Sequence, residues 1–271
     1  LDQPQVMGIL NVTPDSFSDG DRYADPLQAV AAGVDMTSAG AAIIDIGGES
    51  TRPGARAIWE GDEIARVVPV IEGLAASGAA ISIDTRKSEV MSAALTAGAS
   101  LINDVSALTY DDRSAEVIAA AKAPVILMHH QGAPETMQQE PRYDDVLVEV
   151  YLWLEQRIAA AEAASIDRSR ILLDVGFGFG KTVAHNLELT NGLALFHSLG
   201  CPLVLGASRK RTIGALSGEA PADQRLGGSL AFAHKAVEQG VQIVRVHDVP
   251  ETVQALKIWR GLRDQALTPR L

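Results

Sequence analysis

Polar or ionisable side chains stand at the carboxyl end of every short apolar run in this sequence. Eight such runs end in carboxylates, amides, imidazoles, hydroxyls or cations: Asn11, Asp45, Asp84, Asn103, His129, Asp174, the triplet Ser208, Arg209 and Lys210, and the pair Arg245 and His247. A lone Asp or Asn at such a place usually caps a helix or closes a turn. Polar ends on all eight runs indicate an active-site face instead, because the carboxyl ends of parallel barrel strands carry the catalytic residues.

These polar ends fall into two chemical groups. The first supplies carboxylate and amide groups: Asp45, Asp84, Asn103 and Asp174. Paired acceptors suit a planar heterocycle with several N–H donors, since such a site rejects ligands that lack those donors. Oxygen ligands of this kind suit magnesium or manganese equally well. The residues by themselves leave both interpretations open.

The second group is cationic and follows the last two runs: Arg209, Lys210, Arg245 and His247. The loops after strands seven and eight of (β/α)8 enzymes frequently bind phosphate. Because the chain as a whole is acidic, four cations in this region indicate an anion site rather than scattered surface charge. Together the two groups predict an enzyme that joins a phosphate-bearing, donor-rich heterocycle to a second substrate.

The spacing of the runs predicts the elements that position these residues. The apolar runs cover residues 6–10, 42–47, 80–84, 101–105, 124–129, 171–176, 202–208 and 243–248, and Ala-, Leu- and Glu-rich stretches such as 144–165 and 223–240 have helical spacing. Apolar strands that alternate with helices indicate a parallel sheet covered by helices. Eight such units predict the α/β class and a closed (β/α)8 TIM barrel, one domain over residues 1–271. An open doubly wound sheet is the alternative.

Composition narrows the class of protein. The chain has 271 residues, a formal net charge of −11 and 47% hydrophobic residues. The acidic balance argues against nucleic acid and anionic membranes as partners, and no run is long and apolar enough to predict a membrane span. The single cysteine, Cys201, excludes an internal disulfide and indicates a buried, inert thiol in a reducing compartment. We expect a cytoplasmic protein, although a leader could have been removed before Leu1.

Two polar segments leave the predicted face, Thr13 to Asp21 and the stretch "GGESTRPGAR" at 47–56. Their Gly, Pro, Ser and Asp content predicts irregular connections. Because both follow strand ends, we expect them to act as lids over the site.

Several ordered blocks resemble the dihydropteroate synthase family, the pterin-binding TIM-barrel enzymes of folate biosynthesis. They include "GILNVTPDSFSDG" (8–20), "DIGGESTRPGA" (45–55), "SIDTRK" (82–87), "LDVGFGFGK" (173–181), "GASRK" (206–210) and "RVHDV" (245–249). The resemblance implies a homodimeric sulfonamide target. The implied reaction condenses 6-hydroxymethyl-7,8-dihydropterin pyrophosphate with p-aminobenzoate by dissociative substitution at the pterin methylene, with magnesium, and releases 7,8-dihydropteroate and pyrophosphate.

The resemblance also implies a role for each matched residue. The pterin ring is held by Asp45, Asp84, Asn103, Asp174 and Lys210. The pyrophosphate is bound by Asn11, Arg245 and His247, with Asn11 also a ligand of the magnesium ion. The p-aminobenzoate site is formed by Thr51, Arg52, Pro53 and Ser208, while Phe17 belongs to the first lid. Catalysis is assigned to Asp15, Lys210, Arg245 and His247.

Two other functions fit part of the pattern. A methyltetrahydrofolate-dependent methyltransferase shares the fold and the pterin, but it does not require Arg245, His247 and the 49–54 segment together. A catalytically silent pterin-binding paralogue is less consistent with a complete catalytic set. Adjacent residues of a strand face opposite sides, so His129 and His130 are not expected to form a two-histidine metal site inside the barrel.

Overall fold

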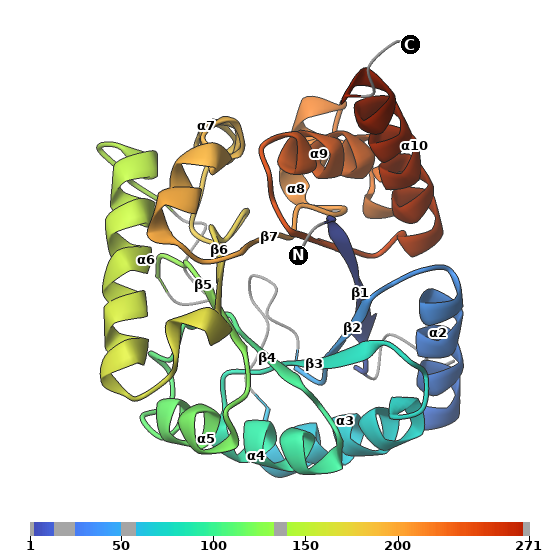
Figure 1. Ribbon diagram of the computed structural model, residues 1–271, viewed down its shortest axis with the longest axis vertical. Helices are drawn as coiled ribbons and strands as arrows, with labels where there is room; N and C mark the ends of the chain where they lie inside the picture. Colours follow the sequence, from blue (N-terminus) through green and yellow to red (C-terminus); the bar gives the residue numbers. More distant parts are fainter. Residues whose placement is uncertain (1–2, 14–24, 50–57, 133–139, 268–271) are drawn as a thin grey trace.

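Eight parallel strands pair in sequence order and close into a barrel (Figure 1). The computed structural model describes residues 3–13, 25–49, 58–132 and 140–267. The strands are β1 (Gln5–Asn11), β2 (Ile43–Gly47), β3 (Ala80–Asp84), β4 (Leu101–Asp104), β5 (Val125–Met128), β6 (Ile171–Asp174), β7 (Leu203–Leu205) and β8 (Ile243–Val246). The ring closes where β1 pairs with β8, with Met7 opposite Arg245. This confirms the predicted (β/α)8 barrel.

Helices surround the barrel (Figure 1). They are α2 (Pro26–Ser38), α3 (Glu60–Leu74), α4 (Ser88–Ala97), α5 (Ser114–Ala121), α6 (Val146–Ala163), α7 (Val183–Asn191), α8 (Arg211–Leu216), α9 (Leu226–Glu238) and α10 (Val249–Leu267), with short 3-10 turns at Arg168–Arg170, Leu193–Leu199 and Ala222–Gln224. The stretches predicted to be helical at 144–165 and 223–240 correspond to α6 and α9. None of the helices in the described ranges has the length and hydropathy needed to cross a membrane.

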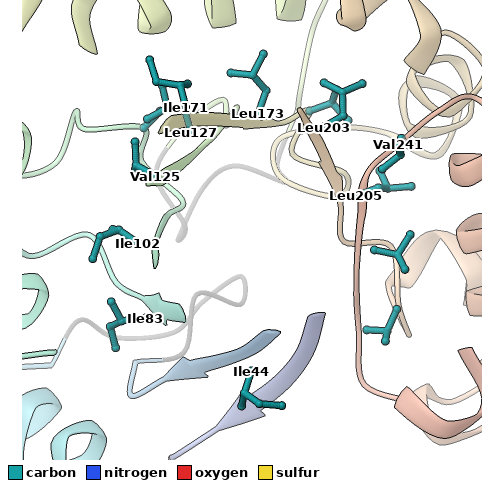
Figure 2. Close-up of a cluster of buried hydrophobic side chains, with 14 of the residues drawn as sticks. Ile44, Ile83, Ile102, Val125, Leu127, Ile171, Leu173, Leu203, Leu205 and Val241 are labelled. Atoms are coloured by element: carbon teal, nitrogen blue, oxygen red, sulfur yellow. The ribbon is translucent and has the colours of Figure 1, made fainter. Parts of the chain in front are cut away.

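The apolar character of the strands follows from burial on both faces. Side chains such as Ile44, Ile83 and Leu173 point away from the barrel toward the helices (Figure 2) and are fully buried. The alternate positions face inward, and a small cluster formed by Met7, Leu101, Ile126, Val204 and Ile243 fills the interior. Burial of both faces is the reason that these strands appear as apolar runs rather than as alternating patterns.

The last two strands are shorter than the sequence suggests. β7 ends at Leu205 rather than at residue 208, and β8 ends at Val246 rather than at residue 248. Arg209 has a left-handed backbone with φ of 57°, which is incompatible with a continuing strand. Ser208, Lys210 and His247 therefore lie in turns beyond the strands, where their side chains are not restricted to strand alternation.

Candidate active site

Strand alternation places the predicted carboxylate and amide side chains inside the barrel, at the carboxyl ends of its strands. We call this end of the barrel the mouth. Asp45 and Asp84 face inward from β2 and β3, one step beyond the apolar layer, and Asn103 lies opposite Asp84 in the β3–β4 register. The Asn103 Nδ2 group donates to Asp45 Oδ2 at 3.0 Å, which fixes the orientation of the amide. All three side chains are buried, so the structure brings these predicted residues together.

Arg245 crosses the mouth and pairs with two of these carboxylates. Its Nε lies 2.6 Å from Asp45 Oδ2 and its Nη2 lies 2.7 Å from Asp84 Oδ2. Burial opposes the charged guanidinium, but Asp45 and Asp84 outweigh burial and hold the pKa of Arg245 above its ordinary value. The sequence suggested separate acidic and cationic groups. In the structure Arg245 joins them, because β8 pairs with β1 and its inward side chain reaches across the barrel.

Buried acceptor oxygens without a partner face the same mouth. Asp45 Oδ1, Asp84 Oδ1 and Ser82 Oγ are buried and have no hydrogen-bond partner within the described residues. Burial without a partner is costly, so such oxygens normally belong to a network that a ligand or water completes. Their chemistry is that of a site for N–H donors.

The charge state of Asp84 is sensitive to this environment. Burial raises the pKa of Asp84 to about 7, although the Arg245 guanidinium acts in the opposite direction. Asp45 adds to the increase by like-charge repulsion. Ligand binding that changes the partners of Asp84 will therefore be pH-dependent near neutrality.

Asp174 and Lys210 form the opposite side of the mouth. Asp174 Oδ1 accepts the Gly176 N–H at 2.7 Å, and burial raises the pKa of Asp174 while Lys210 lowers it. Lys210 Nζ donates to the Phe177 carbonyl and lies 4.4 Å from the centre of the Phe179 ring. Burial lowers the pKa of Lys210 to about 8, and Asp174 opposes that shift. The mouth thus presents an acceptor and a donor side by side.

Small residues keep the space between these groups open. A Cβ atom on Gly47 would lie 3.8 Å from Asn11 Oδ1 and 3.9 Å from Asp84 Oδ2, so both atoms face one space. A Cβ on Gly206 would lie 3.9 Å from Asp174 Oδ2 and 3.7 Å from the Arg245 stem. Larger side chains at these two positions would fill the mouth.

Ser208 and His247 are joined beside Arg245. Ser208 Oγ accepts the backbone N–H of His247 at 3.1 Å and lies 3.0 Å from its Nδ1. If the hydroxyl donates to Nδ1, the ring proton lies on Nε2, which then acts as a donor. Ser208, expected at the p-aminobenzoate site, therefore also orients an imidazole expected at the pyrophosphate.

Arg209, expected among the four cations of the anion site, pairs with Asp248 in the structure. Its Nε donates to Asp248 Oδ2 at 3.0 Å and its Nη2 donates to Asp248 Oδ1, so the guanidinium forms a bidentate pair. The hydrogen bond to Asp248 raises the pKa of Arg209. Its left-handed backbone redirects the side chain at the point where β7 would have continued.

Five of the expected site residues lie outside the described residues: Asp15, Phe17, Thr51, Arg52 and Pro53. Their roles and the two expected lids remain predictions from the sequence. Among the described residues, no group of three His, Cys, Asp or Glu side chains is placed to hold a metal ion.

The sequence reasoning missed Lys181, which is buried behind Asp174. Lys181 Nζ lies 2.8 Å from His129 Nδ1 and donates to the Phe179 carbonyl at 3.0 Å. Burial lowers the pKa of Lys181 well below its ordinary value. The block "GFGFGK" contained the signal, because a lysine that follows three alternating glycines lies on a tight turn.

His129 lies beyond β5, and the strand-alternation argument does not apply to it. Its ring meets Trp153 edge-on with centroids 4.8 Å apart, and the His130 ring also approaches Trp153 at 5.9 Å. Both imidazoles therefore approach the α6 side. The His129 ring packs against Trp153, and burial lowers its pKa to about 2, so the ring is neutral.

The sequence analysis also missed a second cluster of buried charged side chains, which lies beside Asp84. Lys87 Nζ is 2.7 Å from Glu63 Oε2 and 3.1 Å from Glu49 Oε2, and it donates to the Ile58 carbonyl at 2.8 Å. The group ties together the two described ends of the connection between β2 and α3.

A (β/α)8 barrel with this mouth is the architecture of a pterin-binding enzyme, and the model of the family "Pterin binding enzyme" matches residues 7–247. The chain is 49% identical to the dihydropteroate synthase of Escherichia coli strain K12 over 259 residues, which cover 95% of this chain and 91% of that protein. It is also 49% identical to the dihydropteroate synthase of Neisseria meningitidis serogroup B strain MC58, with 97% and 94% covered.

Solved structures agree. The dihydropteroate synthase of Yersinia pestis with a sulfonamide drug complex superposes with a TM-score of 0.92 at 47% identity, covering 98% of this chain and 96% of that one. The dihydropteroate synthase of Xanthomonas albilineans with 4-aminobenzoic acid superposes with a TM-score of 0.91 at 48% identity, covering 97% of this chain and 94% of that one. The chain belongs to the dihydropteroate synthase family.

Proposed function

We infer that this chain condenses 6-hydroxymethyl-7,8-dihydropterin pyrophosphate with p-aminobenzoate to form 7,8-dihydropteroate and pyrophosphate. The observation that carries this inference is the set of partnerless buried oxygens, Asp45 Oδ1 and Asp84 Oδ1, beside Arg245 in the mouth. A pterin edge carries the N–H donors that these oxygens lack, and its diphosphate suits the guanidinium. Family membership selects this ligand from others of similar chemistry.

Substrate binding would exchange the partners of Arg245. In the present arrangement the guanidinium neutralises Asp45 and Asp84. Pterin donors would take over at these carboxylates, with Asn103, Asp174 and Lys210 completing the contacts to the ring. Arg245 would then turn toward the diphosphate with His247, whose ring is oriented by Ser208. Such an exchange avoids leaving a buried charge without a partner, which is the costly alternative.

The chemical step places charge where these residues lie. As the C–O bond at the pterin methylene breaks, its electron pair leaves with the pyrophosphate, and the amine nitrogen of p-aminobenzoate forms the new C–N bond and then loses a proton. Arg245 and His247 stabilise the departing anion through preorganised donors. The aromatic amine is neutral at pH 7, so it requires no general base for activation. Asp15 is proposed to stabilise positive charge at the methylene.

Magnesium is proposed to enter with the diphosphate. The Asn11 amide oxygen faces the mouth beside Asp84, as the Gly47 geometry shows, and such an oxygen is a suitable ligand for a hard cation. A single protein ligand fits an ion that keeps several waters and takes its other ligands from phosphate. When bound, the ion would neutralise charge on the leaving group.

The remaining assignments are also proposals. Thr51, Arg52, Pro53 and Ser208 are proposed to bind p-aminobenzoate. The Xanthomonas albilineans relative solved with 4-aminobenzoic acid and the Yersinia pestis relative solved with a sulfonamide drug complex support a p-aminobenzoate site that sulfonamides also occupy. A homodimer is proposed from the family resemblance.

Pyrophosphate release is the decisive measurement. The enzyme should release pyrophosphate from the dihydropterin substrate only when p-aminobenzoate is present, and 7,8-dihydropteroate should appear in equal amount. A methyltransferase would release none, and a silent paralogue would bind the pterin without turnover. Neither alternative is supported by the relatives from Escherichia coli and Neisseria meningitidis, which are dihydropteroate synthases.

A further inference from the structure

The connection between β6 and α7 forms a glycine turn that supports Lys210. We use this name for residues 175–182. Gly176, Gly178 and Gly180 all have left-handed backbones, with φ of 69°, 82° and 63°. A Cβ on Gly176 would lie 1.7 Å from the His129 carbonyl oxygen, so only glycine fits there.

Lys210 contacts one side of the glycine turn. A Cβ on Gly178 would lie 3.1 Å from the Lys210 Cδ atom, so the lysine stem passes directly over that residue. The ammonium group donates to the Phe177 carbonyl and lies over the Phe179 ring. The turn also supplies the Gly176 N–H to Asp174. The orientation of both Lys210 and Asp174 therefore depends on the position of this turn.

Lys181 and His129 hold the same turn from the protein interior. Lys181 is 3% exposed, and its Nζ donates to the Phe179 carbonyl and to His129 Nδ1. Because the His129 ring is neutral, Nδ1 is available as an acceptor. Trp153 packs against that ring, and Tyr143 donates to the Gly180 carbonyl at 2.9 Å. The interior contacts therefore fix the turn at two carbonyl groups.

We propose that Lys181 and His129 are positioning residues for the pterin half of the site, acting through the glycine turn on Lys210 and Asp174. This proposal rests on the proposed function, since it assigns the pterin ring to Lys210 and Asp174. Neither Lys181 nor His129 needs to touch a substrate. The pair controls where the ammonium and the carboxylate stand, so its removal affects the pterin selectively and leaves p-aminobenzoate binding largely unchanged.

The test compares three variants. Lys181→Met removes the donor and His129→Leu removes the acceptor, whereas His129→Asn keeps an acceptor oxygen near the place of Nδ1. For the first two we expect affinity for a pterin without a diphosphate to fall by about tenfold to a hundredfold, the range that supporting contacts commonly control. The KM for the dihydropterin substrate should rise in parallel, while the KM for p-aminobenzoate stays within about twofold. His129→Asn should restore most of the pterin affinity, as expected for lost geometry rather than lost chemistry.

Controls separate positioning from general stability. Lys257→Met replaces an exposed lysine on α10 and should change neither the pterin affinity nor the KM for either substrate. If Lys181→Met does not fold, the comparison of His129→Leu with His129→Asn carries the test alone. Unchanged pterin affinity in folded Lys181→Met or His129→Leu would overturn the proposal. The proposal would also be overturned if binding of both substrates weakened equally, or if His129→Asn lost as much pterin affinity as His129→Leu.

Failure of the proposed function would be distinguishable from failure of this proposal. A wild-type enzyme that binds the pterin but releases no pyrophosphate would contradict the function. Calorimetry with the pterin would still decide the role of Lys181 and His129.

Discussion

Arg245→Ala should destabilise this protein strongly, because the Arg245 side chain is only 20% exposed and pairs with two buried carboxylates. The substitution leaves Asp45, which is completely buried, and Asp84, which is 8% exposed, without their shared counter-charge. Removing one partner of a buried ion pair typically costs about 3–5 kcal/mol. For a chain of this size, that loss corresponds to a fall in Tm of roughly 10 °C. Arg209→Ala is the matched control, because the Arg209 side chain is 37% exposed and such pairs contribute about 1 kcal/mol or less.

The stability lost in Arg245→Ala should increase as the pH rises. Burial holds the pKa of Asp84 at about 7 even with Arg245 present, and removal of the guanidinium raises it further. A carboxyl group whose pKa is raised by folding contributes to the stability of the folded state at low pH. That contribution is lost as the pH rises through the folded-state pKa. The difference between Arg245→Ala and wild type should therefore be larger at pH 8.5 than at pH 6.

Urea unfolding at these two pH values measures the effect. Adding Asp84→Asn to Arg245→Ala should recover part of the lost stability, because a neutral amide needs no counter-charge. Equal losses for Arg245→Ala and Arg209→Ala, or no recovery in the double variant, would show that the ion pair does not neutralise the mouth.

Four further outcomes follow from the structure. Asp84→Ala should fold and fail to bind the pterin in calorimetry, since the loss of an acceptor for buried donors costs a few kcal/mol (about 1–3 or more); unchanged affinity would contradict the assignment. Wild-type pterin affinity should fall by up to about tenfold per pH unit below pH 7 as Asp84 takes up a proton, and Asp84→Asn should abolish this dependence. Turnover should require a divalent cation and stop after rigorous chelation, with recovery on addition of magnesium; full activity in chelator would refute the role given to Asn11. Cys201, which is buried and whose pKa burial raises, should react with a thiol reagent only on unfolding.

The fold and much of the site could be predicted before the structure, because both depend on local regularities. Apolar runs that alternate with helical stretches define eight strand–helix units, and the end of each run marks the barrel mouth. Asp45, Asp84 and Asn103 were taken from the ends of their runs, and strand alternation places all three on the inner face of the barrel. The adjacent Asp104 faces the other way and accepts the Ser106 and Leu108 N–H groups in a turn, as expected for an ordinary strand-end acid.

Turn geometry limited what could be predicted. The sequence extended β7 through residue 208 and placed Arg209 with the anion-binding cations, but the left-handed backbone at Arg209 sends its side chain to Asp248. His129 was placed among the polar strand ends that face the active site, whereas it lies beyond β5 and packs against Trp153. Residues in irregular connections follow no period, so their directions cannot be read from spacing.

The sequence by itself determined which elements form, which strand positions face inward and which chemical groups collect at the mouth. Those properties follow from the order of apolar and polar residues along one chain segment. Only the tertiary structure decided that Arg245 pairs with Asp45 and Asp84, 200 and 161 residues away in sequence. It alone also placed Lys181 against His129, which lies 52 residues earlier. Such pairings are set by closure of the barrel and by the high cost of leaving a buried charge or donor without a partner, and neither is encoded in local spacing.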